Sequence, residues 1–545
     1  MSASGVSETM RHRVAVGDLL ASWAARRPDR LCLAMDDREY TFAEMDEMAD
    51  QVHAGMAGIG VRLGDRVATL APNRIELLEL FHGLARAGVI QVPLNAYLKS
   101  TFLRHQLGQS RSRVLVVDRQ GRAAIEPLLT ELPDLKTIIH LDEPDRELVA
   151  RSGRREIRYS EVTSAGELRA APDVSASDTI AIIYTSGTTG LPKGCVLSHG
   201  YYCRCGELNA AALELTDEDV LFASLPLFHA GGLLIVLMSA LYRGVPARFE
   251  SSFSARAFFD RASVTEATVA IGVGAMGAAL LASQSSTADR QHRLRTMMVA
   301  PMAPESQNRF RDRFGIEPWT EVFGQTECMP ITVTPLSSGA RDADGCGLPA
   351  PDLDFALLDD AGDPVPDGAV GEICVRPLDD PYAMFDGYWT PEGRMTTPLD
   401  DGWHHTGDSG RRLPSGSIAF VDRKKDSIRR RGENVSSLEL EVAISAHPGV
   451  AECAVHAVPS DMADDDIKVC LVLVDGADFD PIEFFAFARA ALPYFAIPRY
   501  VEVVSQLPRN AVGRVMKHAL REAPHTVGTV DLQALGLTVV RAERR

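Results

Sequence analysis

The stretch YTSGTTGLPKG, Tyr184–Gly194, governs how the rest of this chain is interpreted. It follows the apolar, β-branched run TIAIIY (179–184), which is typical of a buried strand. Its glycines let the backbone bend so that N–H groups can point into one concave space, where hydroxyl groups and the Lys193 ammonium add donors. The stretch therefore predicts a polyphosphate-binding loop. A surface Ser/Thr/Gly linker is the alternative, but a linker needs neither a buried strand before it nor a single lysine. The candidate ligands are Thr185, Ser186, Gly187, Thr188, Thr189, Gly190 and Lys193.

The length and charge of the chain narrow the class of protein. With 545 residues it is too long for one hydrophobic core, so we expect two or more domains. The net charge of -18 argues against nucleic acid or an anionic membrane surface as a partner. The N-terminus has no apolar signal-peptide core, and no apolar run reaches the roughly 20 residues that span a bilayer. Nine scattered cysteines without CxxC spacing are typical of reduced thiols, so we expect a cytoplasmic protein.

Apolar periodicity in the N-terminal half predicts alternating helices and strands. Residues 14–60 have helical spacing, and Thr41 with Glu44 three residues later is a capping signal. Further elements are expected at 66–70 (strand), 76–87 (helix), 89–94 (strand) and 114–117 (strand). This alternation is typical of an α/β fold with parallel layers.

A second motif, EVFGQTE (321–327), suits a magnesium nucleotide. Thr326 places a hydroxyl group beside the carboxylate of Glu327. A hydroxyl group can donate to an α-phosphate oxygen while a carboxylate ligates Mg²⁺. With the upstream loop, this pair predicts one nucleotide site built from distant segments.

Together, these motifs resemble the signatures of the adenylate-forming superfamily, which contains acyl-CoA synthetases, aryl-CoA ligases, adenylation domains of peptide synthetases and luciferases. GWHHTGD (402–408) is similar to the superfamily's GWxxTGD, which implies that Asp408 binds the ribose hydroxyls. VDRKKD (421–426) is similar to its DRxKD segment, which implies that Arg423 also reaches the ribose and that Lys425 is a hinge. The resemblance also implies an adenine site at Ala300, Pro301, Phe323 and Gly324, although the two glycines usual before Ala300 are absent.

Two segments carry candidate residues for the pocket that binds the substrate of the enzyme, an acid. LPLFHAGG (225–232) is similar to a segment that lines the acyl pocket, so His229 is a catalytic candidate, with a structural histidine as the alternative. AIGVGAM (270–276) is small and apolar, and the resemblance places it in a wall of the substrate cavity.

The C-terminal segment LPRNAVGRVMK (507–517) departs from the superfamily pattern. The superfamily has a catalytic lysine directly after the glycine, where this chain has Arg514. Arginine keeps the charge but is planar and fork-shaped, so the exchange is not neutral. Arg514 is the candidate by position, and Lys517 is the alternative by chemistry.

The resemblance implies an N-terminal AMP-binding domain over 14–424, a small mobile α+β domain over 425–522 and a tail over 523–545. The segments PYFAIPRY (493–500) and DRKKD are most similar to carnitine/crotonobetaine-type CoA ligases. The implied activity is that of an acyl-CoA synthetase, with ATP, Mg²⁺ and CoA as cofactors and a small-molecule acid as substrate. Alternatives are a non-CoA acceptor, such as nitrite activation for diazotisation of an aromatic amine, and a nucleotide-binding pseudoenzyme. The sequence leaves the acid and the oligomeric state open.

Overall fold

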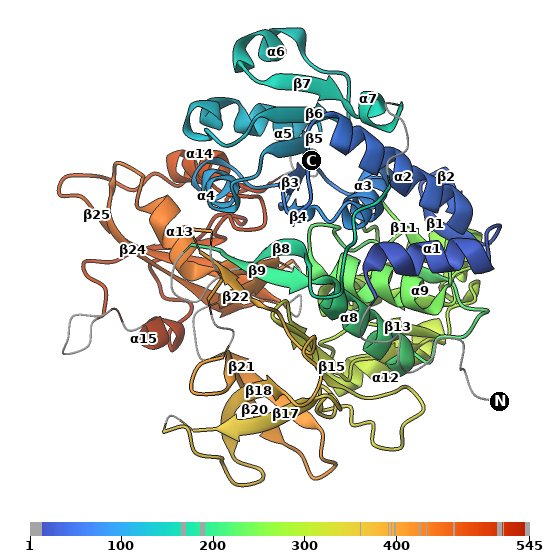
Figure 1. Cartoon of the computed structure of the whole chain (residues 1–545). Coiled ribbons are helices and arrows are strands. Elements are labelled where there is room, and N and C mark those ends of the chain that lie inside the picture. Colours follow the sequence, from blue (N-terminus) through green and yellow to red (C-terminus); the bar gives the residue numbers. More distant parts are fainter. Residues whose placement is uncertain are drawn as a thin grey trace. The chain divides into compact units, whose positions relative to one another are not determined.

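The computed structural model describes residues 14–164, 170–185, 191–359, 361–390, 392–393, 395–396, 399–423, 427–431, 433–460, 464–508, 515 and 517–539. The chain divides into two compact units (Figure 1). The first comprises Met1–Ala96, Leu107–Tyr184 and Gly194–Asp422, and the second comprises Tyr97–Gln106, Thr185–Lys193 and Arg423–Arg545. The predicted domain boundary after Lys424 lies outside the described residues.

An eight-stranded sheet carries the phosphate-loop strands. Its order is β19-β9-β8-β4-β3-β5-β6-β7, parallel along β8-β4-β3-β5-β6-β7, with β19 antiparallel to β9. The strands are β3 (Arg66–Leu70), β4 (Ile90–Pro93), β5 (Val114–Val117), β6 (Thr137–His140), β7 (Arg155–Arg158), β8 (Thr179–Thr185), β9 (Lys193–Ser198) and β19 (Gly387–Trp389). All four residues of β5 are buried, as expected for a parallel strand covered on both faces.

A seven-stranded sheet of order β14-β13-β12-β10-β11-β1-β2 forms the second layer. Its strands are β1 (Leu31–Met35), β2 (Arg38–Thr41), β10 (Leu221–Ala223), β11 (Ala247–Phe249), β12 (Val269–Ile271), β13 (Thr296–Met298) and β14 (Glu317–Trp319). Two small antiparallel sheets follow: β15 (Val322–Gln325) with β16 (Cys328–Val333), and β17 (Leu353–Leu358), β18 (Val370–Pro377), β20 (His404–Arg412) and β21 (Ile418–Arg423) in the order β17-β18-β20-β21.

Helices flank these sheets. They are α1 (Val16–Arg26), α2 (Phe42–Gly58), α3 (Ile75–Arg86), α4 (Ser100–Ser110), α5 (Arg119–Ile125), η2 (Glu126–Glu131), α6 (Arg146–Ser152), α7 (Tyr159–Ser164), α8 (His199–Ala212), η3 (Gly231–Leu237), α9 (Met238–Arg243), α10 (Phe258–Val264), α11 (Gly274–Ala282), η4 (Thr287–Arg290) and α12 (Pro304–Phe314). The predicted capping box is present at α2: the Thr41 hydroxyl accepts from the Glu44 N–H, and the Glu44 carboxylate accepts from the Thr41 N–H.

The prediction of helical structure throughout residues 14–60 is wrong for the β1–β2 hairpin. The apolar run of β1 is too short for its periodicity to separate a helix from a buried strand. In the structure β1 pairs with β11 in parallel and with β2 in antiparallel fashion. Asp36, with φ 53°, makes the tight turn between the two strands.

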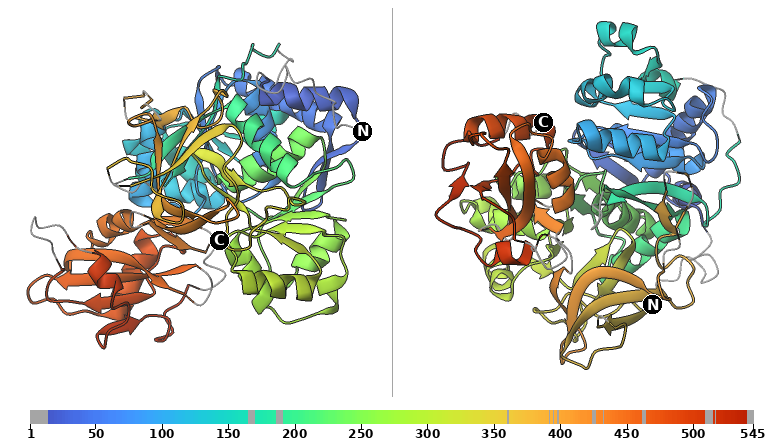
Figure 2. Two further views of the ribbon diagram at one scale, coloured as in Figure 1. Left: turned by 90° about the horizontal axis from the view of Figure 1, so that it is seen from below. Right: turned by 90° about the vertical axis from the view of Figure 1, so that its left-hand side faces the viewer.

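The C-terminal unit is an α+β domain. It contains β22 (Ser427–Arg430), β23 (Glu433–Ser436), α13 (Ser437–Ile444), β24 (Val450–Pro459), β25 (Asp465–Leu473), α14 (Pro481–Ala491), β26 (Tyr500–Val503), α15 (Lys517–Arg521) and β27 (Thr529–Asp531). β24-β25-β26-β27 form one sheet, and α13 and α15 pack on β24. These elements are the orange-to-red ribbons of Figure 2. β27 lies in the segment predicted as a tail and adds a strand to this sheet.

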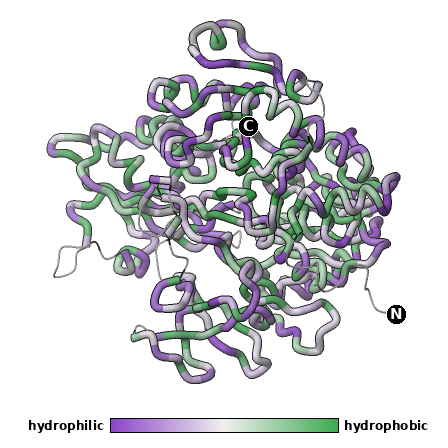
Figure 3. The backbone as a smooth tube through the Cα atoms, in the orientation of Figure 1, coloured by the Kyte–Doolittle hydropathy of each residue, from purple (hydrophilic) through white to green (hydrophobic). Residues whose placement is uncertain are grey.

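Short apolar and polar stretches alternate along the traced chain (Figure 3). None of the described helices is long and apolar enough to cross a membrane.

Candidate active site

A two-residue hairpin turn presents the predicted phosphate and metal ligands. Gln325 pairs with Cys328 at the end of the β15–β16 ladder, so Thr326 and Glu327 form the turn between the two strands. A turn this short fixes the backbone of both residues. The tandem hydroxyl and carboxylate therefore stand at the tip of a rigid element.

Helix α8 holds this hairpin from one side. Tyr201 donates its hydroxyl proton to the carbonyl of Thr326 (2.9 Å), and Arg204 donates to the carbonyl of Met329 (2.7 Å). The buried Arg204 guanidinium also forms a two-point contact with the Asp352 carboxylate, at 2.7 Å for each bond. Since α8 follows β9 directly, the strand that leaves the phosphate loop leads into the helix that fixes the Thr326–Glu327 turn.

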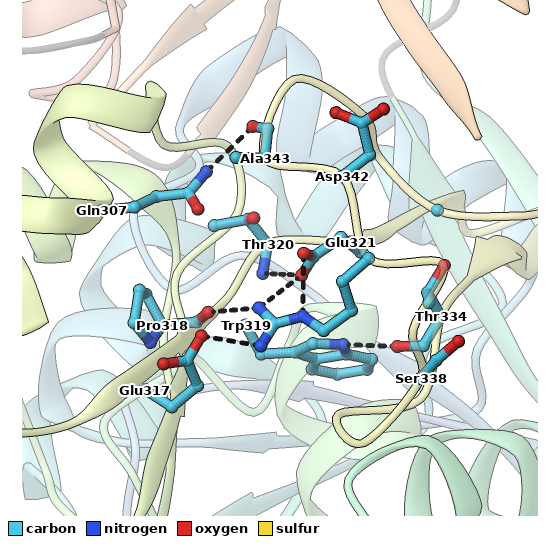
Figure 4. Close-up of polar contacts among 12 residues, drawn as sticks. Gln307, Glu317, Pro318, Trp319, Thr320, Glu321, Thr334, Ser338, Asp342 and Ala343 are labelled. Atoms are coloured by element: carbon cyan, nitrogen blue, oxygen red, sulfur yellow. Dashed lines mark hydrogen bonds and ion pairs between the residues drawn. The ribbon is translucent and has the colours of Figure 1, made fainter. Parts of the chain in front are cut away.

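A charge cluster around the buried Glu321 carboxylate holds the base of the same hairpin (Figure 4). Arg341 donates two 2.9 Å hydrogen bonds to the Glu321 carboxylate and one of 2.7 Å to Glu317. The ring N–H of Trp319 donates to the carbonyl of Thr334 (2.8 Å), which joins β14 to the end of β16. Glu321, which opens the EVFGQTE motif, is thus anchored by ionic contacts that the motif itself did not reveal.

Glu327, the predicted metal ligand, is buried and contacts Tyr388. The Tyr388 hydroxyl group donates to Oε1 of Glu327 (2.8 Å). Burial and the neighbouring carboxylate raise the pKa of Tyr388 well above its usual range, so the hydroxyl group stays a donor. Tyr388 lies on β19 opposite Cys195 of β9, which brings the metal ligand close to the strand that follows the phosphate loop.

Asp408, the predicted ribose ligand, is hydrogen-bonded to Gln325 of this hairpin, although 83 positions separate the two residues. Nε2 of Gln325 donates to Oδ2 of Asp408 (2.6 Å) and to the carbonyl of Thr406 (2.8 Å). The carboxylate is 2% exposed. The structure thus brings the EVFGQTE and TGD motifs together, through a glutamine that the sequence prediction passed over.

The candidate adenine segment packs against the small apolar segment. The Gly274 N–H donates to the carbonyl of Ala300 (3.0 Å), and a Cβ at Gly274 would lie 2.1 Å from the carbonyl oxygen of Pro301. Only glycine allows that approach. The ring of Phe323, next to Gly324 on β15, lies 5.9 Å from that of Phe420.

His229 lies half-buried in the loop between β10 and η3, and its ring is 4.9 Å from that of Phe228. Asn73, which is buried, fixes this loop: Nδ2 donates to the carbonyl of Leu225 (2.8 Å), and Oδ1 accepts from the N–H of Leu227 (2.8 Å). Next comes η3, a seven-residue π-helix. π-helices are rare in proteins, and those that do occur often lie at functional sites.

Several predicted ligands lie at the limits of the described residues. β8 ends at Thr185 and β9 begins at Lys193. Arg423 is the last residue of β21. The positions outside the described residues, or with undescribed side chains, are Ser186, Gly187, Thr188, Thr189, Gly190, Arg423 (side chain), Lys425 and Arg514.

Lys517 is anchored within the C-terminal unit. Its ammonium group donates to Oγ of Ser437 and pairs with Oε1 of Glu441, both at 2.7 Å. The same Glu441 oxygen accepts from the N–H of Val455 (2.7 Å). These contacts tie α15 to α13 and β24.

A family profile described as AMP-binding enzyme matches residues 20–389, and one described as AMP-binding enzyme C-terminal domain matches residues 439–514. The chain belongs to the AMP-binding enzyme family. The crotonobetaine/carnitine–CoA ligases of Salmonella heidelberg and Salmonella typhimurium are 31% identical to it over 487 residues, which is 89% of this chain and 93% of theirs.

Solved structures agree with this family. An anthranilate CoA ligase in complex with anthranoyl-AMP superposes with a TM-score of 0.70 at 25% identity, over 96% of this chain and 99% of that one. An o-succinylbenzoate CoA synthetase from Bacillus subtilis gives 0.80 at 24% identity, over 95% and 99%, and shows the shared fold. The predicted superfamily and fold class and the prediction of an enzyme are therefore confirmed.

Proposed function

We propose that this enzyme is an AMP-forming acid–thiol ligase. A carboxylate attacks the α-phosphorus of Mg-ATP and forms an acyl-adenylate, with release of pyrophosphate. The thiol of CoA then displaces AMP and gives an acyl-CoA. The observation that carries the proposal is the convergence of the Thr326–Glu327 turn with Asp408 through Gln325, supported by CoA ligases among the relatives and neighbours.

Each group in the site has a role in this reaction. Thr326 would donate to the α-phosphate, and Glu327 would hold Mg²⁺, which would neutralise charge on the phosphates. Asp408 accepts from the ribose hydroxyls. Ala300, Pro301, Phe323 and Gly324 are the candidates for the adenine, and the sequence motifs make Thr185–Lys193 the candidate for the phosphates and Arg423 a further candidate for the ribose. No general base is required because the substrate carboxylate is already ionised at neutral pH.

The charge that bridges the carboxylate and the α-phosphate is assigned to Arg514. Lys517 has the preferred chemistry, but it is committed to Ser437 and Glu441. A guanidinium fork can contact a carboxylate and a phosphate together. His229 remains the candidate for contact with the acid substrate, because Asn73 fixes the loop that carries it.

Three consecutive arginines on β22 and its turn, Arg429, Arg430 and Arg431, are candidates for binding the phosphates of CoA, but their surroundings differ. Arg430 is buried, pairs with Asp466 (3.1 Å) and donates to the carbonyl of Ile497, and burial lowers its pKa to about 10. Arg429 is half-buried and Arg431 is exposed. We therefore assign the phosphates of CoA to Arg429 and Arg431 and a structural role to Arg430.

The test is ATP–pyrophosphate exchange over a panel of acids that includes carnitine, crotonobetaine, anthranilate and simple aliphatic acids, followed by product analysis with CoA. Acid-dependent exchange followed by a CoA thioester supports the proposal. Exchange without any CoA product would mean that the enzyme uses an acceptor other than CoA. Product formation only from nitrite and an aromatic amine would mean the same. If no acid supports exchange and ATP still binds, the protein binds nucleotides but is not a ligase.

A further inference from the structure

A His–carboxylate cluster lies directly behind the candidate ribose-binding turn. In the described part of the chain, Glu372, Cys374 and His405 are the one set of His, Cys and acidic residues whose donor atoms all lie within 4.8 Å of one another. Glu372 and Cys374 are buried on β18, and Cys374 pairs with His405 of β20 across the ladder. The cluster was invisible in the sequence because it depends on strand pairing between segments 31 positions apart.

A β-bulge separates this cluster from Asp408. Glu372 pairs with Ser409, while Cys374 pairs with His405, so residues 406–408 stand opposite Ile373 alone. Gly407 has φ 72°, which a residue with a Cβ rarely adopts. Bulges of this kind leave backbone groups without their ladder partners and turn side chains toward functional sites.

The Glu372 carboxylate takes the place of the missing ladder partner. Its Oε1 accepts from the Gly407 N–H (3.0 Å), and its Oε2 contacts Nδ1 of His405 (3.1 Å). Within the bulge, the Thr406 hydroxyl group donates to the carbonyl of Ile373 (2.7 Å) and accepts from the Asp408 N–H (3.1 Å). A buried carboxylate therefore fixes the backbone directly before Asp408.

His405 is held in turn by two carboxylates. Its Nδ1 faces Glu372 and lies 3.4 Å from the Cys374 sulfur, and its Nε2 contacts Oδ1 of Asp401 (3.2 Å). Both carboxylate distances are those of hydrogen bonds from an imidazolium. Burial opposes the charged ring, but the contacts with Glu372 and Asp401 outweigh it and raise the pKa of His405.

We propose that Glu372 and protonated His405, with Asp401 behind them, are positioning residues that hold the Thr406–Asp408 bulge so that Asp408 can receive the ribose hydroxyls. The proposal rests on the ribose contact assigned to Asp408 under the proposed function. It adds that the affinity gained from the ribose depends on a charged pair that does not itself touch the nucleotide.

The experiment compares the binding of ATP and 2′,3′-dideoxy-ATP by calorimetry. The variants are Glu372→Gln, His405→Gln and Asp408→Ala, with His140→Gln as the matched control. His140 of β6 pairs with Glu156 (2.5 Å) of β7, the strand at one edge of the eight-stranded sheet. A general loss of structure weakens both ligands alike, whereas loss of the ribose contact lowers only the preference for ATP.

We expect Asp408→Ala to abolish the preference for ATP and Glu372→Gln and His405→Gln each to reduce it about tenfold, the scale of one hydrogen bond to a charged group. His140→Gln should leave the preference unchanged. In the wild type the preference should also fall as pH rises through the raised pKa of His405, and in His405→Gln it should be flat with pH.

Three results overturn the inference in separable ways. If Asp408→Ala abolishes the preference while both cluster variants retain it, the positioning role is wrong and the ribose assignment stands. If Asp408→Ala retains the preference, the ribose assignment itself is wrong. If the wild type binds one equivalent of Zn²⁺ tightly and Cys374→Ser loses it, the cluster is a metal site, since Cys, His and Glu are all zinc ligands.

Discussion

At the scale of single residues, the site depends on side chains that orient other side chains. Tyr388 and Gln325 each donate to a carboxylate with an assigned nucleotide role, namely Glu327 and Asp408. Neither was singled out in the sequence. Gln325 lies in the motif in which Thr326 and Glu327 were predicted as the phosphate and metal ligands. Tyr388 reaches Glu327 only because β19 pairs with β9. A contact that depends on the pairing of distant strands leaves no local pattern in the sequence.

Replacement of Tyr388 by Phe should weaken the use of Mg²⁺. The change removes the donor to Oε1 of Glu327 and keeps the ring, so the carboxylate loses one fixed orientation. We expect the Mg²⁺ concentration that gives half-maximal pyrophosphate exchange to rise about tenfold, the scale of one hydrogen bond to a charged group. Tyr159→Phe is the control, because Tyr159 donates to Glu79 (2.9 Å) in a comparable pair. An equal effect of both changes would assign the loss to general destabilisation.

At the scale of elements, the β15–β16 hairpin relies on the Arg341 cluster of Figure 4. Arg341→Ala would leave the Glu321 carboxylate, 2% exposed, without its ionic partner. The loss should destabilise the hairpin by about 3 kcal/mol, the range for breaking a buried ion pair. Hydrogen exchange of the amides in residues 322–333 should speed up in this variant while that of the C-terminal unit stays unchanged. Arg311→Ala, which removes a pair of intermediate exposure with Glu317, should cost less than about 1 kcal/mol; an equal effect would contradict the account.

The contacts of Glu156, on the edge strand β7, with His140 of β6 and with Arg122 predict how the stability of the protein depends on pH. Burial opposes the charge of Glu156, but hydrogen bonds from His140 and Arg122 outweigh it and lower the pKa of Glu156 to about 2. Because the pKa is depressed in the folded state, the stabilisation is present above the ordinary value of 4.5 and is lost as pH falls toward 2. The difference in Tm between the wild type and Glu156→Gln should therefore shrink across that interval. A difference that is constant from pH 6 to pH 3 would contradict the assignment.

The β1–β2 hairpin and the predicted strands show which elements the sequence could predict. Strands such as β3 and β5 were predicted at their observed bounds, because a parallel strand covered on both faces is one apolar run between polar ends. The short run of β1 has no such signature, since a helix turn and a strand of that length bury similar residues. The π-helix η3 was not predicted, and only the backbone shows it.

At the scale of the whole molecule, the motifs predicted the family, which is confirmed, whereas the nucleotide ligands and the acid pocket stay predictions. Asp408 and Glu327 were predicted as ligands because each lies in a short motif that can be read directly in the sequence. The wall predicted for the acid pocket depends on packing, such as the approach of Gly274 to Pro301, which is set by the distance between two backbones. Residue type alone does not encode that distance.

The C-terminal unit should supply the catalytic charge through Arg514. We expect Arg514→Ala to lower pyrophosphate exchange about 100-fold or more, the scale of one preorganised charge-stabilising donor. Lys517→Ala and Glu441→Gln should behave alike, with a modest loss and a lower Tm, because the two residues form one structural pair. If Lys517→Ala abolishes exchange while Glu441→Gln retains it, Lys517 is the catalytic charge. If both alanine variants retain full exchange, the C-terminal unit supplies no catalytic charge in the adenylation step.

The most direct test of the central claim is to follow α-labelled ATP in the wild type and in Asp408→Ala, with the acid selected from the panel. The account predicts labelled AMP as the nucleotide product, formed only when the acid and CoA are both present. In Asp408→Ala, AMP formation should fall by about 10- to 100-fold at limiting ATP, because a buried charged contact with the ribose is lost. Labelled ADP as the product, or an unchanged rate in Asp408→Ala, would contradict the account.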